Sequence, residues 1–446
     1  MKSIKDWCAE HNITEVECLV ADMAGIPRGK ILPTGKFLDG LDEKSHRLPE
    51  SVYIQTVTGD FPQDKEIVDP IDIDVILDPD PNTIRPVPWY DEPTAQIICD
   101  SHYVDGSEVE LSSRQILRRV LALYAERDWK PIVAPELEFF LVKVNADPDY
   151  PLEPPIGRSG RPETGRQSFG IDAVNEFDPL FEDVYDYCDA QQIDIDTLNH
   201  ESGAAQFEIN FRHGDPLSLA DQVFLFKRTV RQTATRHNVY ATFMAKPMQI
   251  EPGSSMHIHQ SVIDGKTGRN IFINDDGTDG PRLSHFIGGL QKYMPATLAL
   301  AAPNVNSYRR FTYHEAPINT HWGYDNRTCG LRVPSSPPEA RRIENRLAGA
   351  DVNPYLAFAG TLVAGYLGLI EEIEADQPHK ESVYNLPRNL PQHLDDALHA
   401  MEKCEPIRKA LGERFVEAAV AVKNAEYHTY LTVISSWERE HLLLNV

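Results

Sequence analysis

The sequence predicts an α+β fold built from a small domain over residues 1–105 and a large domain over residues 106–446. Two observations lead to this prediction. Strand-like runs and helical stripes follow each other without the regular alternation, and without the glycine fingerprint, of a parallel dinucleotide-binding sheet. The first 105 residues hold short strands separated by Asp, Gly and Pro clusters, and the first long helical stripe comes after them. We therefore expect an α+β fold around an antiparallel sheet, and a domain boundary near residue 106.

Residue periodicity assigns the N-terminal elements in chain order. Strands are predicted at VECLVADMAG from residue 16, IDIDVIL from residue 71 and TAQIICDSH from residue 94. A serine-capped helix follows over residues 112–129, and its apolar stripe predicts one buried face. The stripe consists of Ile116, Leu117, Val120, Leu121 and Tyr124.

Strands and helices are intermixed in the C-terminal part. Strands are predicted at PIVAPELEFFLV, AAQFEINF and SSMHIHQSV. A Pro- and Gly-rich stretch, Asn145–Gln167, is expected to be a surface loop. Helices are predicted over residues 217–237, 284–300, 351–373 and 406–426.

The composition excludes several classes of function. The formal net charge is −25 and no basic stripe is present, so we expect no nucleic-acid partner. Six scattered cysteines without zinc-binding spacing, and a start without an apolar signal segment, indicate a reducing cytoplasm. The longest apolar run, Leu356–Ile370, is too short to cross a membrane and predicts a buried helix.

Two glutamates interrupt an apolar strand. Glu136 and Glu138 lie in VAPELEFFLV, where side chains alternate between faces, so both point to one side with Cα atoms roughly 6.6 Å apart. This spacing suits two carboxylates that reach neighbouring cations, which would offset the cost of burying them. The same pattern fits a strand end with one wet face, and the segment alone leaves both interpretations open.

Three further clusters carry acids, imidazoles and arginines. NHESGAAQFEINF holds Glu201 in a turn and Glu208 in the strand that follows. GSSMHIHQSV places His257 and His259 on one strand face, a pattern that ordinary core histidines also show. In PEARRIENRLAGADVNPY, Glu344 lies among arginines, which would equally describe a salt-bridged surface stretch.

Taken together, these clusters favour phosphoryl transfer. Carboxylates with a single imidazole suit Mg²⁺ or Mn²⁺ better than zinc. Metals and arginines neutralise polyphosphate, and further arginines bind a substrate carboxylate. The stretch Gly29–Phe37 is no phosphate-binding P-loop, because five residues rather than four separate its glycines and Phe follows the GK pair. The arginines concerned are Arg310, Arg327, Arg332, Arg342 and Arg346.

Seven ordered motifs resemble the glutamine synthetase family, and they cover nearly the whole chain: PELEFFL, ESGAAQFEI, TFMAKP, SSMHIHQS, NSYRR, NRTCGLRVP and ARRIENR. LPESVYIQTVTG and the final VISSWEREHLLLNV are similar to the branch that makes γ-glutamyl amides of amines or polyamines, the γ-glutamylputrescine synthetase type. The resemblance implies an N-terminal β-grasp domain and a catalytic domain with a curved antiparallel sheet. It also implies a homo-oligomer, a hexameric ring or dodecamer, with active sites at subunit interfaces. ATP would phosphorylate the γ-carboxylate of L-glutamate, and an amine would then attack the γ-glutamyl phosphate.

The resemblance also implies a role for each candidate residue. One Mg²⁺ or Mn²⁺ site would use Glu138, Glu201 and Glu208, and the other, beside the ATP phosphates, would use Glu136, His257 and Glu344. Glutamate would be held by Gly253, Arg310 and Arg346. ATP and the transferring phosphoryl group would be contacted by Arg327, Arg332, Arg342, His259 and Ser261, with Phe211 near adenine. Glu315 would close the site and help to deprotonate the amine.

Several departures from the family pattern concern the amine. LPESVYIQ lacks the Asp of the DGSS-like motif that helps to bind ammonium, which favours a longer amine and leaves Glu50 as a weak substitute. The loop RFTYHE is one residue shorter than usual. Pro252 replaces the usual Asn before Gly253, and Glu339 stands where many members carry Lys. Tyr384 aligns with a tyrosine that is adenylylated in some bacterial members, in a different flanking sequence.

Four hypotheses follow from these residues. The leading one is an ATP-dependent ligase that joins the γ-carboxyl group of glutamate to an organic amine or polyamine. The alternative within the same class is glutamine synthetase itself, with ammonia as the acceptor. A metal-dependent phosphohydrolase could use the same acids, and a catalytically silent homologue could serve as a nitrogen sensor or a structural ring.

Overall fold

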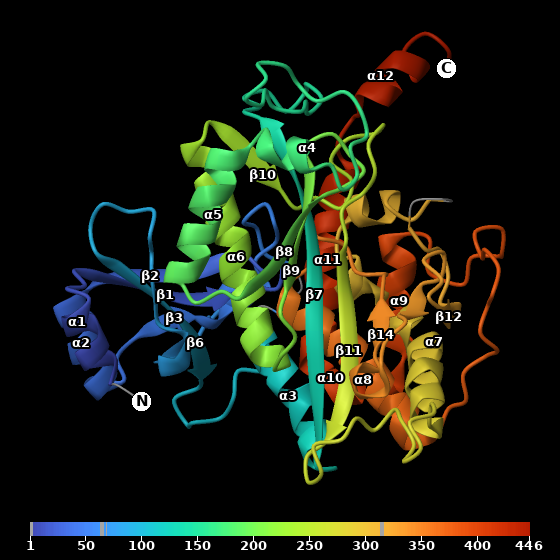
Figure 1. The fold of residues 1–446 in the computed structure, drawn as a ribbon. Coiled ribbons are helices and arrows are strands. Elements are labelled where there is room, and N and C mark those ends of the chain that lie inside the picture. Colours follow the sequence, from blue (N-terminus) through green and yellow to red (C-terminus); the bar gives the residue numbers. More distant parts are fainter. Residues whose placement is uncertain (1–2, 63–66, 68, 313–315) are drawn as a thin grey trace.

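The structure is a computed structural model, and it describes residues 3–62, 67, 69–312 and 316–446. Two sheets organise this part of the chain, one on each side of the position where the sequence predicts a domain boundary (Figure 1). The last strand of the first sheet ends at His102, and the next helix begins at Ser113. The division at residue 106 and the β-grasp assignment of the N-terminal part stay predictions.

The N-terminal sheet is mixed and follows the strand order β2-β1-β6-β4-β3, with β5 paired to β6. Its central strands β1 and β6 run parallel, and the other pairs are antiparallel. The three predicted strands are confirmed as β1, β4 and β6. The strands are β1 (Glu15–Ala21), β2 (Pro27–Pro33), β3 (Arg47–Pro49), β4 (Asp74–Pro79), β5 (Arg85–Pro86) and β6 (Thr94–His102), and the sequence did not predict the accompanying helices α1 (Ile4–Glu10) and α2 (Thr34–Glu43).

The large sheet follows the order β12-β13-β14-β11-β7-β9-β8, with β10 paired to one end of β7. The 15-residue strand β7 lies between β11 and β9 and is the longest strand of the sheet (Figure 1). All pairs are antiparallel except β12 with β13, which is parallel. The strands are β7 (Trp129–Lys143), β8 (Ile195–His200), β9 (Gln206–Phe211), β10 (Val239–Thr242), β11 (Met256–Asp264), β12 (Trp322–Tyr324), β13 (Leu331–Val333) and β14 (Ile343–Asn345).

The predicted helices are present, with one correction. The stretch 406–426 forms two helices rather than one, because Gly412 adopts a φ of 105°, which interrupts the helix between α10 and α11. α8 contains the predicted apolar run, and 89% of it is buried inside the protein, although its length and composition would suffice to span a membrane. The helices are α3 (Ser113–Ala125), α4 (Ile171–Asn175), α5 (Asp178–Ala190), α6 (Pro216–Arg236), α7 (Pro281–Ala301), α8 (Pro354–Glu371), α9 (Leu394–Lys403), α10 (Glu405–Leu411), α11 (Glu413–Leu431) and α12 (Ser436–Leu442), and the 3₁₀ helices are η1 (Glu50–Ile54), η2 (Pro81–Thr83), η3 (Val305–Arg309) and η4 (Pro338–Ala340).

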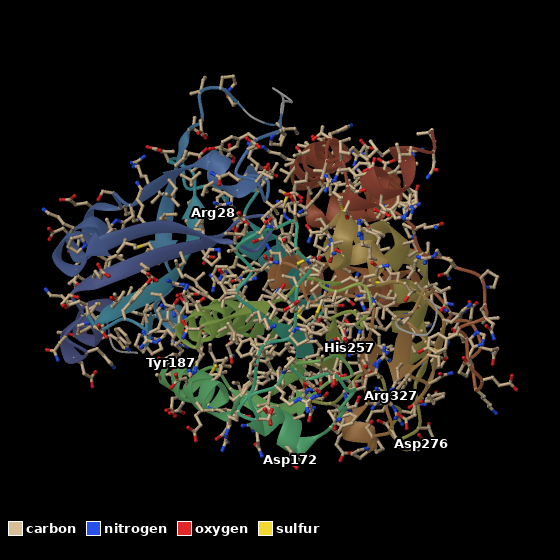
Figure 2. All side chains as sticks on the ribbon, turned by 90° about the horizontal axis from the view of Figure 1, so that it is seen from above. Arg28, Asp172, Tyr187, His257, Asp276 and Arg327 are labelled. Carbon is tan, nitrogen blue, oxygen red and sulfur yellow. The ribbon has the colours of Figure 1, made fainter. Side chains whose placement is uncertain are left out.

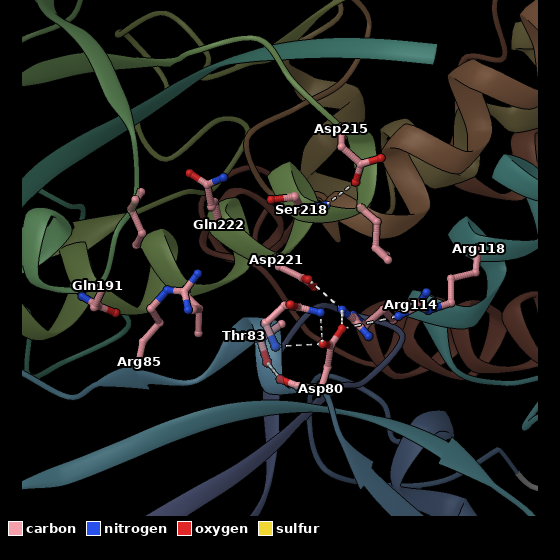
Figure 3. A pocket seen from close by; sticks show the side chains of 14 residues that line it. Asp80, Thr83, Arg85, Arg114, Arg118, Gln191, Asp215, Ser218, Asp221 and Gln222 are labelled. Carbon is pink, nitrogen blue, oxygen red and sulfur yellow. Dashed lines mark hydrogen bonds and ion pairs between the residues drawn. The ribbon is translucent and has the colours of Figure 1, made fainter. Parts of the chain in front are cut away.

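A buried arginine joins the N-terminal sheet to the helices of the large sheet (Figure 3). Arg114 of α3 donates to Asp80 at 2.7 Å, to Asp100 of β6 at 2.6 Å and to Asp221 of α6 at 2.8 Å. Arg114, Asp80 and Asp221 border a cavity of about 320 Å³ between η2, α3 and α6. Because three carboxylates already engage Arg114, the cluster is a structural junction between the two parts of the chain.

Candidate active site

The predicted site residues gather in a second cavity, of about 590 Å³, over one face of the large sheet. Figure 2 shows two of them, His257 and Arg327, on the side of the molecule away from Arg28 of the N-terminal sheet. The predicted residues that line the cavity are Glu136, Glu138, Glu201, Glu208, Gly253, His257, His259, Arg310, Arg327, Arg332, Arg342 and Arg346.

Strand register places several of the predicted site residues side by side across five strands. Glu138 of β7 faces Glu208 of β9, and Glu136 of β7 faces His257 of β11. Residues paired directly across a ladder point to the same face of the sheet, so the glutamates and the histidine share the cavity side. The row continues outward, because β14 places Glu344 opposite His259 of β11 and opposite Arg332 of β13.

Crowding of carboxylates makes one end of this row a site for positive charge. Burial and the neighbouring Glu138 raise the pKa of Glu208 to about 9. Burial and Glu201 likewise raise the pKa of Glu138 to about 7, although the hydrogen bonds that Ser255 donates act to lower this pKa. Carboxylates this close repel one another when ionised, and a divalent cation between them would remove that cost.

His257 lies between carboxylates as a neutral imidazole. Its Nδ1 is 3.4 Å from Glu136 and 3.8 Å from Glu344. Burial, followed by the charge of Arg346, lowers the pKa of His257 to about 4. A neutral imidazole has a lone pair to offer, which is the state in which histidine binds a metal.

The donor set fits a divalent metal at two neighbouring positions. Ligand atoms of Glu136, Glu208 and His257 lie within 4.8 Å of one another, and so do those of Glu136, His259 and Glu344. Glu136 therefore belongs to both groups. The two predicted ligand sets divide these residues differently, and their exact division stays a prediction.

Glu344 is fully buried and is already compensated by arginines. Arg332 and Arg346 each donate to one of its carboxylate oxygens. Burial opposes ionisation of Glu344, but Arg346 holds its pKa below the ordinary range. A cation beside Glu344 would therefore share this carboxylate with two guanidinium groups.

Two arginines that line the cavity carry unsatisfied donors. The Nε atoms of Arg310 and Arg346 are buried and make no hydrogen bond within the described part of the chain. Arg310 donates to the carbonyl oxygen of Leu347 and packs its stem against Gly253. Both guanidinium groups line the cavity, so they present positive charge to a substrate carboxylate.

Three predicted residues do not line the cavity. Phe211 is buried and packs edge-to-face against Phe226 of α6, so nothing in the structure supports its assignment to adenine. Ser261 of β11 does not line the cavity either. Glu344 is the third, although its partners Arg332 and Arg346 do line the cavity. Glu315 lies outside the described residues.

The structure also places residues in the site that the sequence did not predict. Ser255 donates to Glu138, and Asn199 lies opposite Glu208 on β8. The loop expected on the surface is tied to the site at its end, where Glu163 accepts from the backbone N–H of Ala205 at 2.8 Å. Phe169, just beyond that loop, lines the cavity. The signal for Ser255 and Asn199 was present in SSMHIHQS and NHESG, whereas Phe169 stands in no motif.

Glu50 is engaged within its own chain. Arg414 of α11 donates to its carboxylate at 2.9 Å, and the Tyr103 hydroxyl also donates to it. Glu50 does not line the cavity described above. The carboxylate is therefore part of an ion pair between η1 and α11.

Comparisons with known proteins agree with this arrangement. Residues 110–442 match the family model described as glutamine synthetase, catalytic domain. The chain is 35% identical to γ-glutamylputrescine synthetase PuuA of Escherichia coli, over 97% of this chain and 92% of that protein. It is 33% identical to glutamine synthetase of Pyrococcus abyssi (96% and 92%) and 29% identical to glutamate–isopropylamine ligase of a Pseudomonas species (98% and 96%). The solved structure of apo GmaS without ligand superposes with a TM-score of 0.83 at 27% identity and covers all of both chains.

Proposed function

Because the chain belongs to the glutamine synthetase family, we propose that it is an ATP-dependent ligase joining the γ-carboxyl group of L-glutamate to an organic amine. The γ-carboxylate attacks the γ-phosphorus of ATP and forms γ-glutamyl phosphate and ADP. The amine then attacks the carbonyl carbon of γ-glutamyl phosphate, loses a proton and displaces inorganic phosphate, which leaves a γ-glutamyl amide. The observation that carries this proposal is one cavity lined by both clustered carboxylates and arginines.

The arginines that line the cavity have distinct tasks. Arg310 and Arg346 bind a carboxylate group of glutamate. Arg327, which is exposed at the cavity, and Arg342, which donates to His259 at 3.2 Å, neutralise the ATP phosphates and the transferring phosphoryl group. The carboxylate of Glu315 remains our proposed general base for deprotonating the amine.

Two divalent cations, Mg²⁺ or Mn²⁺, fit the proposed mechanism. Glu138, Glu201 and Glu208 would hold one, and Glu136, His257 and Glu344 would hold the other. When bound, such ions withdraw charge from the phosphate oxygens and orient the phosphoryl group for transfer. The raised pKa of Glu208 supports this assignment, because burial and the neighbouring carboxylates oppose its ionisation and a cation would offset both.

An organic amine is the proposed acceptor rather than ammonia. Two similar proteins are named for putrescine and isopropylamine. Phe169 adds an aromatic surface to a cavity lined mostly by charged and polar groups, and 70% of its surface is exposed. A hydrocarbon chain on the acceptor would cover that ring, whereas ammonia would leave it in water.

We propose a cytoplasmic homo-oligomer, a hexameric ring or a dodecamer with active sites at subunit interfaces, in which residues 1–105 form a β-grasp domain. All six cysteines are free, which suits a reducing compartment. Apolar residues near the C-terminus support a subunit contact, since Trp437 and Leu444 are 62% and 91% exposed and α12 projects from the body of the protein (Figure 1).

An acceptor screen tests the proposal. Phosphate release is followed with glutamate and ATP fixed while ammonium, monoamines and diamines are varied, and the γ-glutamyl product is identified by mass spectrometry. We expect saturation with at least one organic amine at a kcat/KM above that for ammonium. Saturation by ammonium alone would identify a glutamine synthetase. ADP release with glutamate but without any amine would indicate a phosphohydrolase.

A further inference from the structure

Ser255 connects the two groups of predicted metal ligands. It stands two residues before His257, where the chain enters β11, and its side chain is buried. The Ser255 hydroxyl donates to Oε1 of Glu138 at 2.7 Å and lies 3.0 Å from Nε2 of His257. The backbone N–H of Ser255 donates to the other oxygen of Glu138 at 2.8 Å. One hydroxyl thus contacts a residue of each predicted set.

The direction of these hydrogen bonds follows from what each group can donate. A Glu138 carboxylate that binds a cation is ionised and can only accept, so the hydroxyl proton of Ser255 must point to Glu138. The Ser255 oxygen then has only lone pairs left for His257, and Nε2 of the imidazole must carry the proton. A neutral imidazole protonated at Nε2 has its lone pair on Nδ1.

Nδ1 of His257 faces the position where a cation would lie. Its neighbours there are Glu136 at 3.4 Å and Glu344 at 3.8 Å, both longer than the roughly 2.9 Å of an ordinary N–H···O bond. A lone pair aimed at two carboxylates is repulsive without a positive charge between them. The opposite tautomer would place a proton at Nδ1 and block that position.

We propose that Ser255 is a positioning residue that fixes His257 in the tautomer protonated at Nε2, so that Nδ1 can bind a divalent cation together with Glu136. Hydrogen-bond partners of metal-binding histidines commonly act in this way and contribute 10–100-fold to metal affinity, by order of magnitude. The inference rests on the metal assignment within the proposed function and is independent of which amine is used.

A Mn²⁺ titration tests the proposal without substrates. Free Mn²⁺ is measured by electron paramagnetic resonance for the wild type and for Ser255→Ala, Ser255→Thr and Ser113→Ala, in the absence of ATP, glutamate and amine. Ser113 of α3 is the matched control, since it is another buried serine. Its hydroxyl donates to the backbone carbonyl of Ala21. Thermal unfolding checks that each variant is folded.

We expect Ser255→Ala to weaken one class of Mn²⁺ site at least tenfold, by the order of magnitude measured for such partners. Ser255→Thr, which keeps the hydroxyl, should restore most of the affinity, and Ser113→Ala should match the wild type. The decisive comparison is a double-mutant cycle in which Ser255→Ala has no further effect once His257 is replaced by Ala.

Three results would overturn the proposal. The first is wild-type Mn²⁺ affinity in Ser255→Ala. The second is an equal loss in the presence and absence of the His257 side chain, which would mean that Ser255 acts through Glu138 alone. The third is a folded wild-type protein that binds no Mn²⁺. Because no amine is present, failure of the acceptor screen would leave each of these results unchanged.

Discussion

Glu136 and His257 are direct partners across the antiparallel pair β7–β11, and both belong to one compact group of ligand atoms with Glu208. Glu136 also accepts from His259 at 2.8 Å, so this single carboxylate meets both histidines of the HxH motif. It lines the cavity, and its side chain is 26% exposed. Glu136 therefore serves the site more than the core.

Glu136→Ala should reduce ligase activity at least a hundredfold, as expected for the loss of a group that positions charge at a reacting phosphate. Folding should be largely retained because the side chain borders the cavity. Product formation and the thermal unfolding midpoint are the measurements. Exposed Glu126, at the end of α3, is a matched control, and Glu126→Ala should keep full activity. A wild-type rate in Glu136→Ala would disprove the metal assignment.

Gly253→Ala should disturb Arg310, which we propose binds the substrate glutamate. An added Cβ would collide with the Arg310 stem and would lie 2.7 Å from the carbonyl oxygen of Ala245. We expect a raised KM for glutamate and a loss of about 1–3 kcal/mol of unfolding free energy through overpacking. Steady-state kinetics and denaturant unfolding measure both.

Gly35→Ala is the matched control for that substitution. A Cβ at Gly35, in α2, would meet nothing within 4 Å. The change should leave the KM for glutamate unaltered and should keep or slightly raise stability, since Ala favours a helix over Gly by roughly 0.5–1 kcal/mol. Equal effects of the two substitutions would argue against the contact with Arg310.

Glu50→Gln should affect stability rather than acceptor use. The carboxylate is buried and bonded by Arg414 and Tyr103, so its loss should cost about 1–2 kcal/mol after allowance for the partly exposed guanidinium. The KM for the amine should not change. Glu110→Gln, which removes a looser pair with Arg119 at 3.6 Å, is the control and should be nearly neutral. A selective rise in the KM for amine would instead assign Glu50 to the acceptor site.

Lys227 should make stability depend on pH. It is buried in α6, donates to the carbonyl oxygen of Val352 at 2.6 Å, and burial, then Arg231, lowers its pKa to about 7. In the unfolded chain its pKa is about 10.4, so between these values the unfolded chain binds a proton that the folded chain does not. The free energy of unfolding should therefore rise by up to about 1.4 kcal/mol per pH unit as the pH increases through this window.

Lys227→Met should flatten that rise, because methionine does not titrate. Urea unfolding at several values between pH 7 and pH 10 provides the measurement. Lys36→Met, at an exposed position of α2, should leave the slope unchanged. A slope that persists in Lys227→Met would show that another group binds the proton.

Phe169→Ala should reduce kcat/KM for apolar amines about fivefold, which corresponds to roughly 1 kcal/mol of lost aromatic contact. The value for ammonium should change little. Tyr150 is a matched control, because it is another aromatic residue with about the same exposure, 69%, on the neighbouring loop, and it does not line the cavity. Equal losses for ammonium and for larger amines would remove Phe169 from the acceptor site.

The sequence by itself determined the residue types and the local elements of this protein. Period-two runs predicted strands β7, β9 and β11, and the apolar run inside α8 predicted a buried helix, because these patterns depend only on neighbouring residues. The mixture of carboxylates, imidazoles and arginines likewise indicated the chemistry of the site before any contact was known. The interruption of the predicted helix at Gly412 could also have been recognised from the sequence, because the residue is a glycine.

Only the tertiary structure decided which of these residues meet. The register of β7 with β9 and β11 places Glu138 opposite Glu208 and Glu136 opposite His257, and a slip of one residue would turn either set to the other face. Such pairings join positions far apart in the chain, and no local pattern encodes them. The same reason hid the pairing of Glu50, the weak substitute for the missing ammonium-site Asp, with Arg414, 364 residues away.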